Sequence, residues 1–172
     1  MAGAATLVIV GLGSNLAHPR RQLARAVFAI ARLPGTRLVR VSRNYVSAPV
    51  GSTTPQPDFV NAAVAARTTL APRALLRFLQ AIERRQMRRH DPETTRNSAR
   101  TLDLDLLLYG RRRIHIAQLE IPHPRMHERA FTLRPLRNIA PAITIPGRGL
   151  ARRFLFAVKH QRIAPTRSHP QR

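Results

Sequence analysis

The stretch Arg100-Thr101-Leu102-Asp103-Leu104-Asp105-Leu106-Leu107-Leu108-Tyr109-Gly110 decides the fold and contains the first candidate site. Its alternation of apolar and polar residues predicts a β-strand, because successive side chains of a strand point to opposite faces of the sheet. The apolar face of this strand would comprise Leu102, Leu104, Leu106 and Leu108. The opposite face would comprise Thr101, Asp103, Asp105 and Tyr109. The two carboxylates would then project side by side, roughly 6.5–7 Å apart along the strand.

This pair of carboxylates is a candidate metal site. Like charges at that separation destabilise a strand unless positive charge lies between them. Asp103 and Asp105 offer oxygen ligands on a rigid face, which suits Mg²⁺ when substrate phosphates complete its coordination. The strand alone leaves a second interpretation open, a solvated polar face whose charges are balanced by nearby arginines.

Length and composition bound the class of protein. A chain of 172 residues fits one domain with a sizeable core. The formal net charge is +22, and Lys159 is the only lysine among the 30 basic residues. Such a charge attracts polyanions, but the basic residues are spread along the chain and indicate only that phosphate of some kind is bound.

Other classes of protein are disfavoured by what the sequence lacks. It has no apolar run of 18 residues that would predict a transmembrane helix. No basic segment precedes the apolar residues 1–10, which therefore indicate a first strand and not a signal peptide. Without cysteine there is neither a disulfide framework nor a thiolate zinc site. We expect a cytoplasmic protein with no membrane partner.

The pattern along the chain predicts the order strand, helix, two strands, helix, strand. The expected strands cover residues 6–12, 37–47, 58–69 and 100–110, and the expected helices cover 19–33, a segment beginning at Pro72, and 127–138. This order is that of the ferredoxin-like split βαβ fold. We therefore predict an α+β fold, with an antiparallel sheet, helices on one face, the other face left for ligands, and C-terminal helical additions. Residues 1–150 would form the domain, and residues 151–172 a basic C-terminal extension whose last eight or so residues are disordered.

Phosphate chemistry is further indicated by the polar segment 84–100, a candidate mobile loop. The chain has neither a P-loop nor a protein-kinase catalytic-loop pattern, so arginines and metal would have to hold a nucleotide. The arginines of the segment are Arg84, Arg85, Arg88, Arg89, Arg96 and Arg100. They lead directly into the acidic strand, which brings cations toward metal ligands as phosphoryl transfer requires. Taken singly, most of them are better explained as solvated surface charges.

Two further residues have chemistry that suits a ligand. His123, held between two prolines, could donate a hydrogen bond to a phosphate. Asn61 shares a strand face with Phe59, so an amide could pair with the edge of a flat ring while the aromatic residue stacks on it. Taken alone, a histidine such as His123 is more often structural than catalytic, and Asn61 could equally be a polar residue of an edge strand.

Six stretches in chain order carry a resemblance to a known family. They are 11–16, 45–51, 56–63, 79–83, 100–110 and 121–126, followed by Arg129, Phe131 and Pro135-Leu136. The most specific are Arg-Thr-Leu-Asp-Leu-Asp and Ile-Pro-His-Pro-Arg-Met. From about Val8 to Pro146 the chain resembles the 6-hydroxymethyl-7,8-dihydropterin pyrophosphokinase family of folate biosynthesis.

The resemblance implies a ferredoxin-like monomer that transfers pyrophosphate from ATP to the pterin hydroxymethyl group and releases AMP. By position, two Mg²⁺ ions would be held by Asp103 and Asp105. The implied ATP contacts are Gln80, Glu83, Arg88, Arg100, Leu106, His123 and Arg129. The implied catalytic residues are Arg88, Arg100, Asp103 and Asp105. The implied pterin pocket comprises Gly13, Ser47, Val50, Phe59, Asn61 and Phe131, with Asn61 pairing with the pterin edge.

The chain also departs from the family pattern. Where many members carry Arg-Trp-Gly-Pro-Arg, it has Arg96-Asn97-Ser98-Ala99-Arg100, so closure of this loop is expected to differ because Asn97 cannot stack. Phe59 stands where tyrosine is frequent. The altered loop leaves open a degenerate member of the family, and the net charge of +22 leaves open a basic nucleic-acid-binding protein on the same fold. We do not expect a nucleic-acid partner, because paired aspartates on the open sheet face would repel phosphate without metal and no paired aromatics mark an RNA-binding sheet.

Overall fold

The computed structural model describes residues 4–52, 54–86 and 99–166. The main sheet contains β1 (Thr6–Ser14), β2 (Thr36–Val41), β3 (Tyr45–Ser47), β4 (Phe59–Thr68), β5 (Asp103–Tyr109) and β10 (Ile163–Pro165). The helices are α1 (Pro19–Ala31), α2 (Pro72–Gln86) and α3 (Ala130–Ile139), with short 3₁₀ turns η1 (Met126–Glu128) and η2 (Ala151–Leu155). Two small hairpins are formed by β6 (Ile114–Ile116) with β7 (Leu119–Ile121), and by β8 (Thr144–Ile145) with β9 (Gly149–Leu150).

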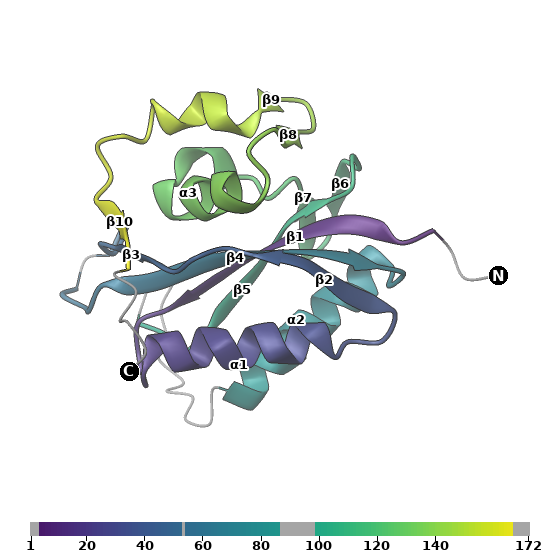
Figure 1. Ribbon diagram of the computed structural model, residues 1–172, viewed down its shortest axis with the longest axis horizontal. Helices are drawn as coiled ribbons and strands as arrows, with labels where there is room; N and C mark the ends of the chain where they lie inside the picture. Colours follow the sequence, from purple (N-terminus) through teal and green to yellow (C-terminus); the bar gives the residue numbers. More distant parts are fainter. Residues whose placement is uncertain (1–3, 53, 87–98, 167–172) are drawn as a thin grey trace.

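The six-stranded sheet has the order β10-β3-β4-β1-β5, and β2 also pairs with β4. All of its strand pairs are antiparallel. α1 connects β1 to β2 and α2 connects β4 to β5, and both helices cover the same face (Figure 1). The other face is covered in part by α3 and η2. The predicted α+β fold, with its split βαβ order and C-terminal helical additions, is confirmed.

Two apolar cores explain why these elements pack. On the α1–α2 side, Leu75, Leu79 and Ile82 follow helical spacing along α2 and meet β-strand residues such as Val10. On the α3 side, a second core joins the sheet to α3 and η2. Because both faces are covered, the central strands are apolar on both sides except where the polar pocket described below opens.

The acidic strand departs from strict alternation at its end. Ile9 pairs with Leu108 but Val10 pairs with Leu106, so Leu107 is the extra residue of a β-bulge. Leu108 therefore packs in the α3 core, whereas Tyr109 packs on the α1–α2 side and donates its hydroxyl to the Leu70 carbonyl at 2.7 Å. The prediction that Leu108 extends the apolar face and that Tyr109 joins the aspartates was wrong, because the bulge exchanges the faces after Leu107.

Other boundaries also differ from those predicted. The single strand expected over 37–47 is two strands, because the chain leaves β2 at Ser42, whose Oγ accepts a hydrogen bond from the Ala63 N–H at 2.9 Å. The helix expected over 127–138 is η1 followed by α3, since Arg129 between them is extended. α2 continues to Gln86, into the segment expected to be a loop. The rest of that expected mobile loop falls mostly on residues 87–98, outside the described residues.

The C-terminal extension returns to the main sheet. β10 pairs with β3, and the two Nη atoms of Arg162 donate to the carboxylate of Asp58, at 2.8 and 2.7 Å. The division at residue 150 stays a prediction, and the disorder expected at the end of the chain falls largely on residues 167–172, outside the described residues. Among the helices of the described segments, none is both long and apolar enough to cross a membrane.

Candidate active site

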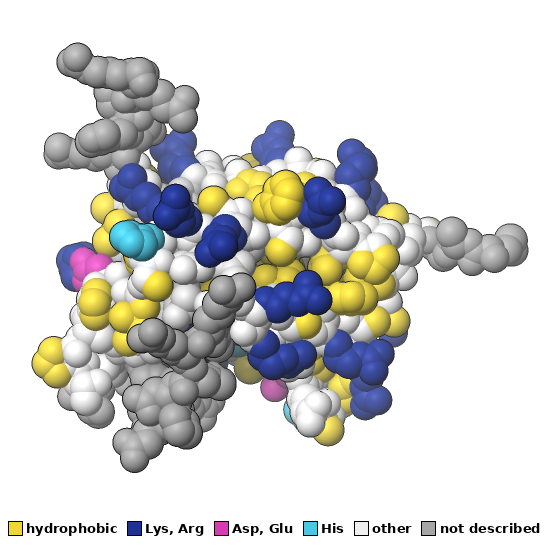
Figure 2. Space-filling view, turned by 90° about the horizontal axis from the view of Figure 1, so that it is seen from below, with side chains coloured by type: hydrophobic (Ala, Val, Ile, Leu, Met, Phe, Trp, Pro, Cys, Tyr) yellow, Lys and Arg dark blue, Asp and Glu magenta, His cyan; other side chains and the backbone are white. Residues whose placement is uncertain are grey.

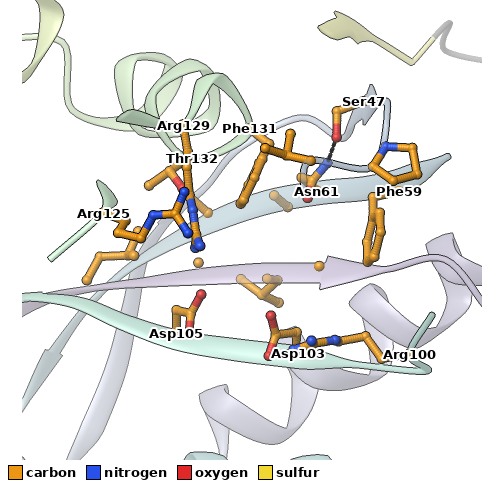
Figure 3. Close-up of a pocket in the computed structure, with 18 of the residues that line it drawn as sticks. Ser47, Phe59, Asn61, Arg100, Asp103, Asp105, Arg125, Arg129, Phe131 and Thr132 are labelled. Atoms are coloured by element: carbon orange, nitrogen blue, oxygen red, sulfur yellow. Dashed lines mark hydrogen bonds and ion pairs between the residues drawn. The ribbon is translucent and has the colours of Figure 1, made fainter. Parts of the chain in front are cut away.

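A pocket of about 220 Å³ opens on the sheet face that α3 leaves uncovered. Its walls come from β1, β4, β5, the segment 47–59 and the start of α3 (Figure 3). The predicted site residues that line it are Gly13, Ser47, Val50, Phe59, Asn61, Arg100, Asp103, Asp105, His123, Arg129 and Phe131. Residues far apart in sequence and assigned from different motifs are thus brought to one cavity.

Two glycines of β1 form the floor of this pocket. Gly11 pairs with Asp105 on one side and with Ala63 on the other, and Gly13 pairs with Asp103 and Asn61. Because glycine carries no side chain, nothing on β1 separates the carboxylates of β5 from the polar residues of β4. A Cβ atom at Gly13 would lie 3.4 Å from Asn61 Oδ1, inside the cavity.

One end of the pocket suits a flat heterocycle. Asn61 is buried, and its Nδ2 donates to Ser47 Oγ at 2.9 Å, which fixes the plane of the amide. Figure 3 shows Asn61 between the rings of Phe59 and Phe131. Aromatic side chains beside an oriented amide provide stacking surface and hydrogen bonds for one edge of a planar ring.

The other end of the pocket is charged. Arg100 Nη1 lies 3.0 Å from Asp103 Oδ1, and Arg125 and Arg129 extend toward Asp105 from the opposite wall (Figure 3). Desolvation, and then repulsion from Asp103, raises the pKa of Asp105 above its usual range. A cation bound beside Asp103 and Asp105 would therefore reduce the repulsion between the two carboxylates.

The carboxylates fit a magnesium ion. Both offer oxygen ligands to one space, which is the donor type that Mg²⁺ prefers. The described part of the chain contains no group of three or more histidine, cysteine or acidic side chains placed to hold a metal. An ion at Asp103 and Asp105 would thus complete its coordination with water and substrate oxygens, which is usual for Mg²⁺ at phosphate-transfer sites.

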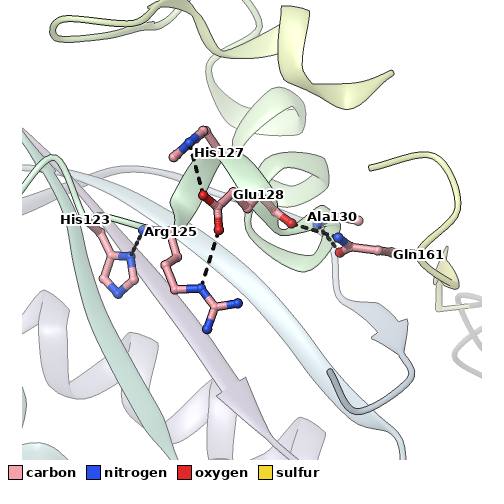
Figure 4. Close-up of polar contacts among 6 residues, drawn as sticks. All are labelled: His123, Arg125, His127, Glu128, Ala130 and Gln161. Carbon is pink, nitrogen blue, oxygen red and sulfur yellow. Dashed lines mark hydrogen bonds and ion pairs between the residues drawn. The ribbon is translucent and has the colours of Figure 1, made fainter. Parts of the chain in front are cut away.

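His123 faces the carboxylates as a neutral hydrogen-bond donor. Desolvation, and then the positive charge of Arg129, lowers its pKa. Its Nδ1 accepts from the Arg125 N–H at 3.3 Å (Figure 4), so the proton of the neutral ring belongs on Nε2, 3.9 Å from Asp105 Oδ1. The His123 N–H donates to the carbonyl of the bulged Leu107 at 2.9 Å, which fixes this loop beside the acidic strand.

Some predicted ATP contacts are not brought into the pocket. Glu83 lies behind the acidic strand, where its Oε1 accepts the Leu104 N–H at 2.6 Å and burial raises its pKa to about 7. The Leu106 side chain belongs to the α1–α2 core, so only its main chain could meet a ligand. Gln80 does not line the cavity. Arg88 lies outside the described residues. These four assignments stay predictions.

Comparison with known proteins decides the family. The family model described as 7,8-dihydro-6-hydroxymethylpterin-pyrophosphokinase (HPPK) matches residues 9–141. The chain belongs to this family. It therefore has hydroxymethyldihydropterin pyrophosphokinase activity in folate biosynthesis, and the family uses ATP.

Relatives named 2-amino-4-hydroxy-6-hydroxymethyldihydropteridine pyrophosphokinase agree with this assignment. The Pseudomonas aeruginosa protein is 50% identical over 139 residues, covering 81% of this chain and 83% of the relative. The Haemophilus influenzae protein is 45% identical over 137 residues, covering 80% of this chain and 83% of the relative. The Bacillus subtilis protein is 37% identical over 137 residues, covering 80% of each chain.

Solved structures show the same fold at low sequence identity. A crystal structure of HPPK-DHPS in complex with substrates superposes with a TM-score of 0.66 at 12% identity, covering 89% of this chain and 43% of that one. Plasmodium falciparum HPPK-DHPS with SDX-DHP gives a TM-score of 0.67 at 12% identity, covering 89% of this chain and 44% of that one. The ferredoxin-like arrangement is thus that of an HPPK domain.

The pocket also contains residues to which the sequence reasoning gave no role. They include Gly11, Gln56, Leu107, Arg125 and Thr132. Gly11, Gln56 and Arg125 lie inside stretches that carry the HPPK resemblance, so those motifs held the signal. Leu107 lies two residues after Asp105 in the same strand, so alternation already places it on the pocket face, whereas nothing in the sequence marks Thr132.

Proposed function

We propose that this pocket transfers pyrophosphate from ATP to 6-hydroxymethyl-7,8-dihydropterin in a Mg²⁺-dependent reaction, with Asp103 and Asp105 holding two ions. The observation that carries this proposal is the arrangement across Gly11 and Gly13. A carboxylate pair and an amide flanked by aromatic rings face one cavity with no side chain between them. A metal–phosphate group and a flat heterocycle bound at these ends would meet above β1.

The pterin would occupy the end formed by Asn61, Phe59 and Phe131. Asn61 is oriented by Ser47 before any ligand binds, so its amide can pair with the ring edge with little further ordering. The rings of Phe59 and Phe131 would stack on the heterocycle. Gly13 leaves the space that the ring requires, and Val50 lines the same wall.

ATP would lie with its phosphates at the charged end. Arg100, Arg129 and His123 surround the carboxylate pair there, and each can donate hydrogen bonds to phosphate oxygens. The bound ions supply positive charge that offsets the charge of the phosphates. The protein contributes orientation and a fixed set of donors, so most of the rate enhancement would come from positioning and electrostatics.

In the transfer step, the pterin hydroxymethyl oxygen forms a bond to the β-phosphorus of ATP. The bond between that phosphorus and the oxygen bridging to the α-phosphate breaks, AMP leaves with the electron pair, and the hydroxyl proton is released. The groups that this proposal uses all lie on one chain, so a monomer would suffice for the reaction. We place the enzyme in the cytoplasm, where ATP is available, with these substrates as its partners.

The test is AMP release from ATP and 6-hydroxymethyl-7,8-dihydropterin, measured with Mg²⁺ and with EDTA. AMP formation that requires the pterin and stops with EDTA is the expected result. AMP formation that persists in EDTA would remove the metal from the proposal. If well-folded protein releases no AMP with both substrates and Mg²⁺, the assignment of this pocket is wrong.

A further inference from the structure

A second groove lies between α1 and α2, across the sheet from the pocket. It has a volume of about 610 Å³ and is lined by Arg21, Ala24, Arg25, Phe28, Arg85 and Gln86. Its arginines are exposed, and the side chain of Phe28 is 63% exposed. None of these residues lines the substrate pocket, so pterin and ATP binding do not explain them.

The cations and the aromatic ring of this groove are ordered along one stripe of α1. Arg21, Arg25 and Phe28 follow at spacings of four and three residues, which places them on one helical face. Arg32, four residues further on, places its guanidinium carbon 5.1 Å from the centre of the Phe28 ring. An exposed ring is thus bracketed by positive charges instead of being covered by apolar neighbours.

The surface around the groove has no exposed negative charge on either helix. The exposed arginines of α1, α2 and the residue after α1 are Arg20, Arg21, Arg25, Arg32, Arg73, Arg77, Arg84 and Arg85. The only acidic residue of the two helices, Glu83, is turned inward to the Leu104 N–H. Figure 2, which views this side, shows arginines over the face, and the acidic side chains of the described residues that it shows lie near the margin.

We propose that this α1–α2 face binds single-stranded nucleic acid, with arginines contacting the backbone phosphates and a base stacking on Phe28. A basic groove combined with an exposed aromatic ring is the arrangement by which proteins bind single strands without reading sequence. The carboxylates that argue against nucleic acid on the other sheet face do not oppose it here, because the sheet separates Asp103 and Asp105 from this groove.

An anionic membrane surface fits these residues less well. Helices that lie in a membrane interface present a contiguous apolar face to the lipid. The apolar faces of α1 and α2 are instead buried against the sheet, and the outer face offers separate rings at Phe28 and Phe78 among arginines. The groove therefore favours a flexible polyanion with flat bases over a bilayer.

The test is fluorescence anisotropy of a labelled uridine 20-mer with the full chain, from 50 to 200 mM KCl. We expect Phe28→Ala to weaken binding by about 5- to 150-fold, the range for one lost stacking contact. The double variant Arg21→Ala/Arg25→Ala should reduce the slope of log K against log salt by about 1.4, as for two lost phosphate contacts on a single strand.

Matched controls lie on the other side of the molecule. Phe156 is 74% exposed with Lys159 Nζ 4.2 Å from its ring centre, so Phe156→Ala removes an equivalent ring. Arg152→Ala/Arg153→Ala removes equal charge from exposed positions of η2. Both controls should change oligonucleotide affinity less than twofold. All four variants should release AMP at the unaltered rate, which verifies that each is folded.

The proposal is wrong if the η2 controls weaken binding as much as the groove variants, because net charge alone would then explain the affinity for the oligonucleotide. It is also wrong if the unaltered chain binds the 20-mer more weakly than about 100 μM at 150 mM KCl, the weak limit of nonspecific binding. Binding to phosphatidylserine vesicles that depends on Phe28, with oligonucleotide binding that does not, would assign the face to a membrane and overturn the proposal.

Discussion

Asn15 holds the main chain of Arg100 through two hydrogen bonds. Its Oδ1 accepts from the Arg100 N–H at 2.8 Å, and its own N–H donates to the Arg100 carbonyl at 3.1 Å. The same side chain donates through Nδ2 to Gln56 Oε1 at 2.9 Å and to the Pro57 carbonyl at 3.0 Å. One buried amide at the end of β1 thus joins the segment that walls the Asn61 end of the pocket to the residue that leads into the acidic strand.

Replacing Asn15 with alanine should damage both stability and turnover. The Arg100 N–H and the Pro57 carbonyl would each lose a partly buried hydrogen bond, which together costs about 1–3 kcal/mol of unfolding free energy. We expect kcat/KM to fall at least about tenfold, because Arg100 and the wall segment at Gln56 and Pro57 would no longer be fixed relative to each other. Urea unfolding and AMP release measure the two effects. Asn138→Ala, which removes an exposed amide accepting the Arg43 N–H, is the control and should change neither by much.

Neutralising either of the two proposed metal ligands should abolish turnover without harming the fold. Asp103→Asn or Asp105→Asn removes one of two facing negative charges, so the unfolding midpoint in EDTA should stay the same or rise. AMP release should fall about 1,000-fold or more, about 4 kcal/mol of transition-state stabilisation. Asp58→Asn, at an exposed carboxylate paired with Arg162, should leave the rate unchanged. Near-normal turnover in both pocket variants would contradict the metal assignment.

The sequence predicted the layers and most of the pocket because local patterns carry that information. Alternation marked the acidic strand, and the family motifs marked residues such as Asn61. The bulge at Leu107 had no signal, since Leu106 to Leu108 are equally apolar and only pairing with β1 reveals it. The partners of Asn15 were likewise invisible, because they belong to segments that meet only in the folded chain.

Arg100 should contribute directly to the transition state. Its guanidinium reaches Asp103 Oδ1 at 3.0 Å within the pocket, while its main chain is held by Asn15 and survives truncation of the side chain. Arg100→Ala should therefore fold normally and lose about 100-fold in kcat/KM, as for a lost phosphate donor. Arg100→Lys should recover only part of this, since lysine keeps the charge but not the planar fork. A loss below threefold in Arg100→Ala would exclude this role.

The buried Glu83 predicts a pH dependence of stability. Desolvation raises its pKa from 4.5 to about 7 in the folded protein, so folding takes up a proton between these values. The contribution of this carboxyl to stability is present below about pH 4.5 and is lost as the pH rises through 7. Glu83→Gln can still accept from Leu104 N–H, so it should match the unaltered chain near pH 4.5 and exceed it by about 1–3 kcal/mol at pH 8.

Urea unfolding in EDTA at pH 5 and pH 8 measures this difference. Asp58→Asn, at an exposed carboxylate paired with Arg162, is the control and should show no such gain with rising pH. An advantage of Glu83→Gln that shrinks with rising pH would show that Glu83 is stabilised as a carboxylate.

Alanine substitutions at Gly13 and at Gly11 should differ in their effect on pterin binding. An alanine Cβ at position 13 would lie 3.4 Å from Asn61 Oδ1 and 4.0 Å from Phe59 Cδ1, whereas one at position 11 would lie 3.2 Å from Leu107 Cδ1. Gly13→Ala should thus raise the KM for pterin about tenfold or more and leave the KM for ATP nearly unchanged. Gly11→Ala, beside Asp105, is the matched control and should affect pterin much less. Initial rates with each substrate varied give these constants. Equal increases in pterin KM for the two variants would mean that the pterin does not sit at the Asn61 end.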